Sequence, residues 1–346
     1  MLGLLFGMLF AVPANVHFDF QGGGVKGLGS ATVFSDVAKR VKNLVATDQT
    51  LSKATVLDMA DSFSGVSAGS IQATLLAYTK AFSTEPTSKS LDDVLKMMTE
   101  YAVIQTQIQE RACCGCFFGL CGNQFDPEPL IEWLVQQFGQ KTLGDLKAKG
   151  VKLEVLGHNM TVDSPILFST EDDNQKDLKL WQIVMASAAF PTGFPAQDFK
   201  IKGEDIIVCD GGLSAKDLSA RAMSSAKSDD IVVLFGTGDS LVDCNKAKTL
   251  QNAGIVGWLR GDIIGRVIDG NTEYSLEETT RNAASKGVHF FPFQYDTHGQ
   301  TLDTSDENLD LIKTEVTAFI KTEDTKKQLD KLARALVENY KKKQSA

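Results

Sequence analysis

Glycine placement is the feature that most constrains how this chain can fold. Three glycine-containing stretches stand far apart in the 346-residue sequence, namely Gly22-Gly23-Gly24-Val25-Lys26-Gly27, Gly65-Val66-Ser67-Ala68-Gly69 and Asp210-Gly211-Gly212. Each follows an apolar or β-prone run, and the first two precede residues with helical spacing. Because glycine has no Cβ, such stretches allow the tight turns that join a strand to the next element. The sequence therefore predicts strands that end at three sharp turns.

Regular elements are expected between these turns. The pattern predicts a strand over 16–20, a second strand that ends near Phe63, and further strands over 152–156 and 166–169. It predicts helices that start at Gly27 and that span 71–81, 91–110, 126–138 and 180–188. Ile206–Cys209 and Ile231–Phe235 are short apolar runs, typical of strands buried on both faces of a parallel sheet. His289–Phe291 reads as a further strand. These elements favour one α/β domain over residues 16–305, followed by a helical C-terminal extension over 306–346.

The charge and composition of the chain limit the kinds of partner that it is expected to bind. The net charge of -9 and the pI of about 5.1 argue against nucleic acid and against a polybasic membrane anchor. No apolar run is long enough for a transmembrane helix. Residues 1–15 form an apolar N-terminal segment that fits either a signal peptide or a buried segment leading into the first strand. The compartment stays open between cytoplasmic or membrane-peripheral and, with a signal peptide, secreted.

Four cysteines crowd into one stretch, Cys113, Cys114, Cys116 and Cys121. A zinc site would need a second pair of ligands that the sequence does not mark, and disulfides would need an oxidising compartment. We favour a third interpretation over these two, a flexible apolar flap whose cysteines would be candidates for acylation. Small residues packed in a loop explain the stretch almost as well.

Ser67 is the candidate nucleophile. In a Gly-x-Ser-x-Gly elbow the serine stands at the start of a helix, where backbone amides favour negative charge. A serine hydroxyl needs a nearby base and a stabilised oxyanion to react. The same five residues also fit an ordinary turn, so the elbow alone decides nothing.

Two side chains compete for the role of base. His298 is the one late histidine in a predicted loop, as a Ser-His-Asp triad would require, whereas His17, His158 and His289 fall in or beside predicted strands. Asp210 fits better, since an apolar strand delivers it to the sheet edge where active sites of α/β proteins collect. A carboxylate held beside the serine can act as general base.

The first glycine stretch also matches a dinucleotide-binding pattern, Gly22-x-Gly24-x-x-Gly27. That fold needs an acidic residue at the end of a second strand, and Asp48, which has about the right spacing, follows no convincing strand. A nucleotide-binding oxidoreductase is therefore the weaker interpretation.

In this order and spacing, the three stretches resemble the patatin-like phospholipase family of Ser-Asp lipid acyl hydrolases. Shorter matches, such as Ala186-Ser187-Ala188-Ala189-Phe190-Pro191 and Phe235-Gly236-Thr237-Gly238, extend the resemblance over roughly 16–310, whereas Gln21 departs from the family's usual residue before the glycines. The resemblance implies a three-layer α/β/α sandwich with a mostly parallel central sheet.

The resemblance also implies the roles of individual residues. Ser67 and Asp210 would be the catalytic pair, and the oxyanion hole would use Gly22, Gly23, Gly24, Lys26 and Gly27. Gly65, Gly69, Gly211 and Gly212 would support the turns. The substrate would be a lipid or phospholipid reached at a membrane surface, with no metal and no other cofactor. A catalytically silent or partner-activated module that binds lipid or protein in the same cleft is the alternative.

Overall fold

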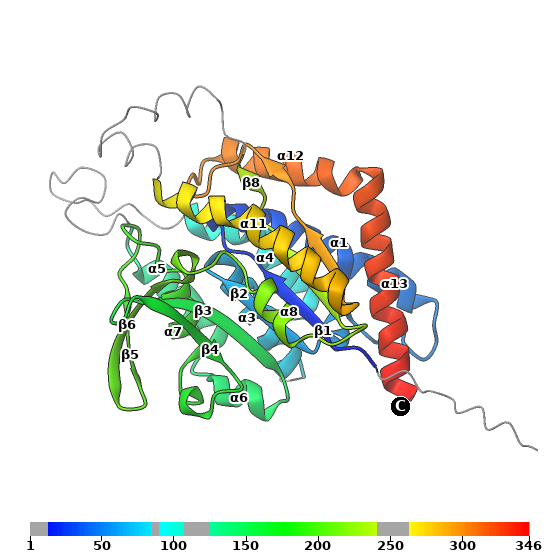
Figure 1. Cartoon of the computed structure of the whole chain (residues 1–346), viewed down its shortest axis with the longest axis horizontal. Helices are drawn as coiled ribbons and strands as arrows, with labels where there is room; N and C mark the ends of the chain where they lie inside the picture. Colours follow the sequence, from blue (N-terminus) through cyan, green and yellow to red (C-terminus); the bar gives the residue numbers. More distant parts are fainter. Residues whose placement is uncertain (1–12, 85–89, 107–124, 241–262, 346) are drawn as a thin grey trace, which may run out of the picture.

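The computed structural model describes residues 13–84, 90–106, 125–240 and 263–345 (Figure 1). The predicted N-terminal segment 1–15 lies mostly outside these residues, and so do the cysteine stretch Cys113–Cys121 and Cys244. Cys209 is described and is a buried free thiol.

A mixed sheet forms the centre of the molecule. Its strand order is β5-β6-β3-β2-β1-β7-β9, with β4 paired to β3. The five strands from β3 to β9 in this order are mutually parallel, whereas β4, β5 and β6 pair in antiparallel fashion. A separate parallel pair joins β8 to β10. The strands are β1 Val16–Phe20, β2 Ser62–Val66, β3 Lys152–Asn159, β4 Ser164–Ser169, β5 Gln197–Ile201, β6 Glu204–Asp210, β7 Ile231–Phe235, β8 Asp239–Ser240, β9 His289–Phe293 and β10 Asp296–Thr297.

Helices follow most of the strands. Their bounds are α1 Gly27–Ala46, α2 Val56–Met59, α3 Ala68–Phe82, α4 Leu91–Thr106, α5 Glu128–Phe138, α6 Leu143–Ala148, α7 Leu180–Ser187, α8 Ser219–Ser225, α11 Ile263–Lys286, α12 Asp306–Lys321 and α13 Glu323–Ser345, with short 3-10 turns η1 Gly24–Lys26, η3 Asp173–Gln175 and η4 Gly211–Leu213. Among the helices described, none has the length and apolar character needed to cross a bilayer.

These helices cover both faces of the sheet (Figure 1). On one face α1, α3, α7 and α13 enclose the main core, which includes Phe18, Phe20 and Phe235. On the other face α8 and α11 pack against β7 and β9, where Val232 contacts Met223 of α8. Side chains of a strand alternate between faces, so β7 supplies apolar side chains to both layers. The predicted three-layer α/β/α sandwich with a mostly parallel sheet is confirmed.

One edge of β3 is shared by two strands that run toward each other. β2 pairs in parallel with β3 as far as Val66 opposite Leu156, and β6 pairs antiparallel from Gly157 onward, where Gly157 faces Asp210. The other edge of β3 is taken by β4. Because a strand has only two edges, β2 and β6 must meet head to head beside Leu156 and Gly157.

This arrangement corrects one prediction. We expected Ile206–Cys209 to lie in a parallel strand buried on both faces, but β6 is antiparallel and Ile207 is exposed. The apolar run looks the same for either direction, and β6 lies beyond the end of β2. The strand ending near Phe63 also continues to Val66, and α3 begins at Ala68, three residues earlier than expected.

The C-terminal helices share the main core. α13 packs along α1, and Leu329, Leu332 and Leu336 of α13 are fully buried in the same cluster as the sheet. The predicted division of the chain at residue 305 stays a prediction.

We expect Leu332→Ala to lower the free energy of unfolding by about 2–5 kcal/mol, because it leaves a cavity in the shared core. Leu311→Ala in α12 is the matched control, since Leu311 is 38% exposed, and it should change stability by less than about 0.5 kcal/mol. Chemical denaturation followed by circular dichroism measures both. Equal, small effects would show that α13 contributes little to the core.

Candidate active site

Ser67 lies in a sharp turn between β2 and α3. It has φ 53° and ψ -124°, a conformation that costs a non-glycine residue about 1–3 kcal/mol. The flanking glycines allow the turn. A Cβ on Gly65 would lie 2.3 Å from the Gly69 carbonyl oxygen, and one on Gly69 would lie 2.0 Å from the Phe20 carbonyl oxygen. The sequence therefore forms the sharp strand-to-helix turn that the Gly-x-Ser-x-Gly pattern predicts.

Asp210 accepts a hydrogen bond from the hydroxyl of this serine. Ser67 Oγ donates a hydrogen bond of 2.7 Å to Asp210 Oδ2, and the amide of Gly212 donates one of 2.7 Å to Asp210 Oδ1. Asp210 is buried, and burial raises its pKa to about 7, although the two hydrogen bonds favour the ionised form. The carboxyl can therefore accept and release a proton near neutral pH.

The glycine stretch after β1 lies beside Ser67. A Cβ on Gly22 would be 3.2 Å from Ser67 Cβ, so the stretch and the elbow are in direct contact. Among the described residues, the amides of Gly23 and Gly24 donate to no protein acceptor. Such amides are suited to binding negative charge.

Lys26 and Gly27 serve other contacts in this structure. Lys26 is fully buried, and its Nζ donates to the Gly238 carbonyl oxygen at 3.3 Å. The carbonyl of Gly27 accepts from Gln72 Nε2 at 2.7 Å, where α1 packs closely on α3. The ammonium of Lys26 thus joins the glycine stretch to the segment after β7.

Gln21, the residue that departs from the family pattern, holds the glycine stretch in place. Its Oε1 accepts from the amide and the hydroxyl of Thr237 at 3.0 and 3.1 Å, and its Nε2 donates to Asp217 Oδ2 at 3.3 Å. The Thr237 hydroxyl also lies 3.0 Å from the Gly22 carbonyl oxygen. Gln21 and Thr237 are fully buried, so their polar groups depend on one another.

The four histidines all lie in the described part of the chain, and none of them forms a hydrogen bond with Ser67. His298, the alternative base, is exposed and pairs with Glu315 at 2.8 Å. His158 contacts Ser214 and Asp163, and His289 lies 4.0 Å from Asp229. Both ring nitrogens of His17 contact serine hydroxyls, and burial lowers its pKa to about 4. The geometry favours Asp210 over His298 as the partner of Ser67.

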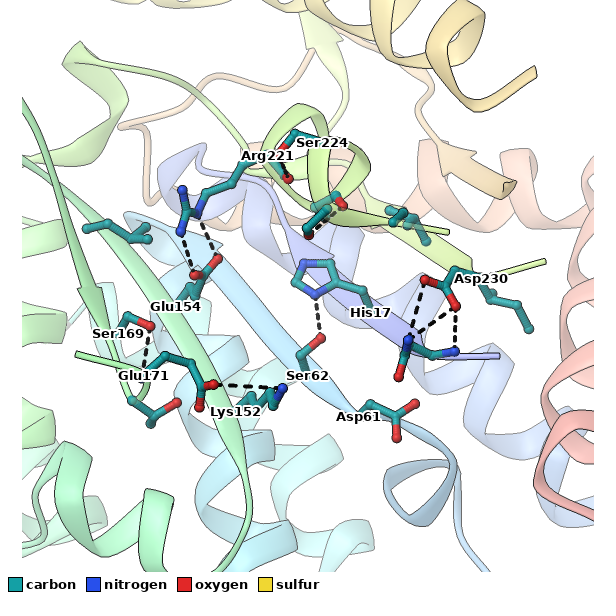
Figure 2. A pocket seen from close by; sticks show the side chains of 18 of the residues that line it. His17, Asp61, Ser62, Lys152, Glu154, Ser169, Glu171, Arg221, Ser224 and Asp230 are labelled. Carbon is teal, nitrogen blue, oxygen red and sulfur yellow. Dashed lines mark hydrogen bonds and ion pairs between the residues drawn. The ribbon is translucent and has the colours of Figure 1, made fainter. Parts of the chain in front are cut away.

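A polar cavity of about 800 Å³ lies elsewhere, on the face of the sheet that carries α8 (Figure 2). Figure 2 shows two ion pairs among its lining residues, Arg221 with Glu154 and Lys152 with Glu171. The Asp230 carboxylate accepts from the amide of Asn15. Neither Ser67 nor Asp210 lines this cavity. We assign no chemistry to it.

The sequence also raised the interpretations of a dinucleotide-binding site and of a metal site. β2, the strand that follows α1, ends at Val66 and Ser67 and not at the carboxylate that a dinucleotide site would need. Within the described residues, no three His, Cys, Asp or Glu side chains are grouped as metal ligands.

Comparisons with known proteins bear on the part of the chain that carries Asp210. Residues 117–218 match the model of the patatin-like phospholipase family. The predicted resemblance is confirmed for that segment. No curated protein matches the chain. Among solved structures, the crystal structure of VipD from Legionella pneumophila aligns with 89% of this chain and 68% of its own, at 10% identity and a TM-score of 0.30. A likeness at that level establishes nothing about activity.

The patatin-like segment contains Asp210 but neither Ser67 nor the glycine stretch. It is the head-to-head meeting of β2 and β6 that brings the serine to the matched aspartate. Gly211 begins the turn that leads the chain away, and a Cβ there would lie 2.2 Å from the Leu156 carbonyl oxygen.

Ser187, also in the patatin-like segment, is a residue whose role sequence reasoning missed. Its hydroxyl accepts from the amide of Ser67 at 2.9 Å and donates to the Leu156 carbonyl oxygen at 2.7 Å. These two backbone groups lie in the gap where β2 and β6 both end, so neither strand continues far enough to pair with them. The fully buried Ser187 hydroxyl satisfies both. A serine in an alanine-rich run gives no signal of this in the sequence.

We expect Ser187→Ala to lower the free energy of unfolding by about 2 kcal/mol or more, because it leaves a buried amide and a buried carbonyl without partners. Displacement of the Ser67 backbone should also slow the reaction of Ser67 with a fluorophosphonate probe. Ser70→Ala is the control, since the Ser70 hydroxyl donates only to the Ser67 carbonyl oxygen. Unchanged stability and labelling in Ser187→Ala would contradict the assignment.

Proposed function

We propose that this protein is a serine hydrolase that cleaves acyl esters of lipids through Ser67 and Asp210. The observation that carries the proposal is the 2.7 Å hydrogen bond from Ser67 Oγ to a buried carboxylate, made from a strained elbow at the start of α3. The match of residues 117–218 to a phospholipase family supports a lipid acyl ester as the substrate.

The proposed reaction has two steps. Ser67 Oγ attacks the ester carbonyl carbon while Asp210 takes the hydroxyl proton, and the tetrahedral intermediate collapses to an acyl-enzyme as Asp210 returns the proton to the leaving alcohol oxygen. Water then attacks the acyl-enzyme, again giving its proton to Asp210, and the fatty acid leaves as the proton returns to Ser67. A pKa of about 7 suits a group that must both accept and give a proton near neutral pH.

The oxyanion would be held by the glycine stretch. The amides of Gly23 and Gly24 donate to no acceptor in the described residues, and Gly22 lies against Ser67. Donors that are fixed before the reaction stabilise developing charge without reorganisation. In this proposal, Gln21 and Thr237 fix those donors, and Lys26 and Gly27 support the same loop from behind.

The first test measures free fatty acid released from phospholipid vesicles and the hydrolysis of a short-chain aryl ester, with and without EDTA. We expect Ser67→Ala to lose at least about a thousandfold and Asp210→Asn at least about a hundredfold in kcat/KM on both substrates. EDTA should change neither rate, because the scheme uses no metal. Activity that survives in Asp210→Asn and is lost in His298→Ala would refute the Ser-Asp assignment.

Stability serves as the control for Asp210→Asn. The folded pKa of Asp210 lies above its ordinary value of 3.8, so ionising the carboxyl destabilises the folded protein as the pH rises from about 4 to about 7. Asparagine stays neutral, and the variant should be at least as stable as the wild type at pH 8. A loss of activity there is then not a loss of fold.

A catalytically silent or partner-activated module of the same fold is the alternative. It would show no turnover on any ester. A fluorophosphonate probe separates the two cases, since an enzyme awaiting an activator would still be labelled at Ser67, whereas a silent module would not.

The pH dependence gives an independent test. Asp210 must be ionised to act as a base, so log kcat/KM for the aryl ester should fall with a slope of about one as the pH drops below about 7. Ser70→Ala, which leaves Ser67 and Asp210 in place, should show the same decrease of log kcat/KM below about pH 7. A decrease only near pH 4 would mean that burial does not raise the pKa of this carboxyl.

A further inference from the structure

The hairpin between β3 and β4 extends beyond the sheet edge that carries Ser67. β3 is paired with β2 only as far as Leu156, and it continues with β6 to Asn159 before the chain turns over residues 160–163. Met160 is four residues beyond Leu156, which places it roughly 13 Å past the level of the elbow, at about 3.3 Å per residue. The turn is therefore the part of β3 that projects furthest on the side of the candidate active site.

Exposed apolar side chains lie on this turn and on the two segments to which it is fastened. Met160 is 55% and Val162 67% exposed in the turn, Ile207 is 46% exposed in β6, and Leu213 is 42% exposed in η4. The amide of Met160 donates to the Ile207 carbonyl oxygen at 2.8 Å, so these two residues are opposite each other and share a face. Leu213 lies in η4, directly after Asp210-Gly211-Gly212. We call these four side chains the apolar tip.

Polar contacts hold the apolar tip in its exposed position. Asn159 Oδ1 accepts from the amide of Thr161 at 2.9 Å, and Thr161 Oγ1 accepts from the amide of Ile207 at 3.1 Å. His158 lies under the turn, with its ring nitrogens 2.9 Å from Ser214 Oγ and 3.0 Å from Asp163 Oδ1. The turn is thus fastened to β6 and to η4, and its apolar side chains are presented to solvent by a fixed backbone.

We propose that the apolar tip docks on the surface of a lipid aggregate with uncharged or zwitterionic headgroups. The inference rests on the proposed function, because Leu213 of the tip follows the proposed base Asp210 by three residues. An exposed apolar group on a fixed turn gains free energy by entering the interface between headgroups and acyl chains. Asp163 at the tip and the net charge of -9 disfavour anionic headgroups.

The test uses the full chain carrying Ser67→Ala, so that vesicles are bound and not consumed. Binding to phosphatidylcholine vesicles is measured by co-sedimentation. We expect Met160→Ser and Val162→Ser each to weaken binding about tenfold, and Val162→Trp to strengthen it, a gain that misfolding cannot produce. Leu311→Ser, an exposed apolar residue of α12, is the matched control and should leave binding unchanged. Adding phosphatidylserine should not strengthen binding.

Activity separates this proposal from the proposed function. With Ser67 intact, Met160→Ser and Val162→Ser should keep the rate on a soluble aryl ester and lose about tenfold on vesicles. If no protein hydrolyses either substrate, the proposed function fails and the binding assay still decides the docking. Equal vesicle binding by all variants would overturn the docking proposal. So would a concentration-dependent dimer in sedimentation that Val162→Ser abolishes, since the tip would then be covered by a second copy.

Discussion

The candidate active site depends on one edge of β3 that two strands share. β2 approaches along this edge from one side and β6 from the other, and the two end within one residue of each other, opposite Leu156 and Gly157. At that point the segments that follow β2 and β6 must both turn out of the sheet. Ser67 Oγ and Asp210 Oδ2 therefore lie 2.7 Å apart. The interrupted ladder leaves backbone groups without partners, and the hydroxyl of Ser187 satisfies two of them. The serine, the carboxylate and their support are thus consequences of a single meeting of strands.

Local backbone strain and burial at this meeting act in the same direction. Ser67 occupies a positive φ that only its surroundings maintain, and Asp210 is kept away from water so that its pKa rises to about 7. Both features destabilise the fold, and both are typical of functional sites. The fully buried contacts of Gln21, Thr237 and Lys26 supply the rigidity that such a site requires.

Sequence reasoning was most successful where a residue type is required by backbone geometry. Gly65 and Gly69 marked the elbow, and Gly211 marked the turn after Asp210, because a Cβ at each of these positions would lie too close to the backbone of another segment. Reasoning failed where the deciding contact is tertiary. The apolar run Ile-Ile-Val-Cys does not indicate the direction of β6. Ser187 resembles any small residue in a helix. Met160 and Val162 are isolated apolar residues in a turn. Gln21 was recognised as a departure, but its bonds to Thr237 and Asp217 depend on segments about 200 residues away.

The antiparallel entry of β6 has a consequence for how such proteins can diverge. The position of Asp210 is set by its pairing with Gly157, and a slip of one residue would turn the carboxylate to the opposite face. The turn over 160–163 is fastened to Ile207 and His158 by hydrogen bonds, none of which involves Gly157 or Asp210. Pairs of residues can therefore be added or removed at the end of this hairpin during evolution. The turn over 160–163 would change, while the hydrogen bond between Ser67 and Asp210 stays in place.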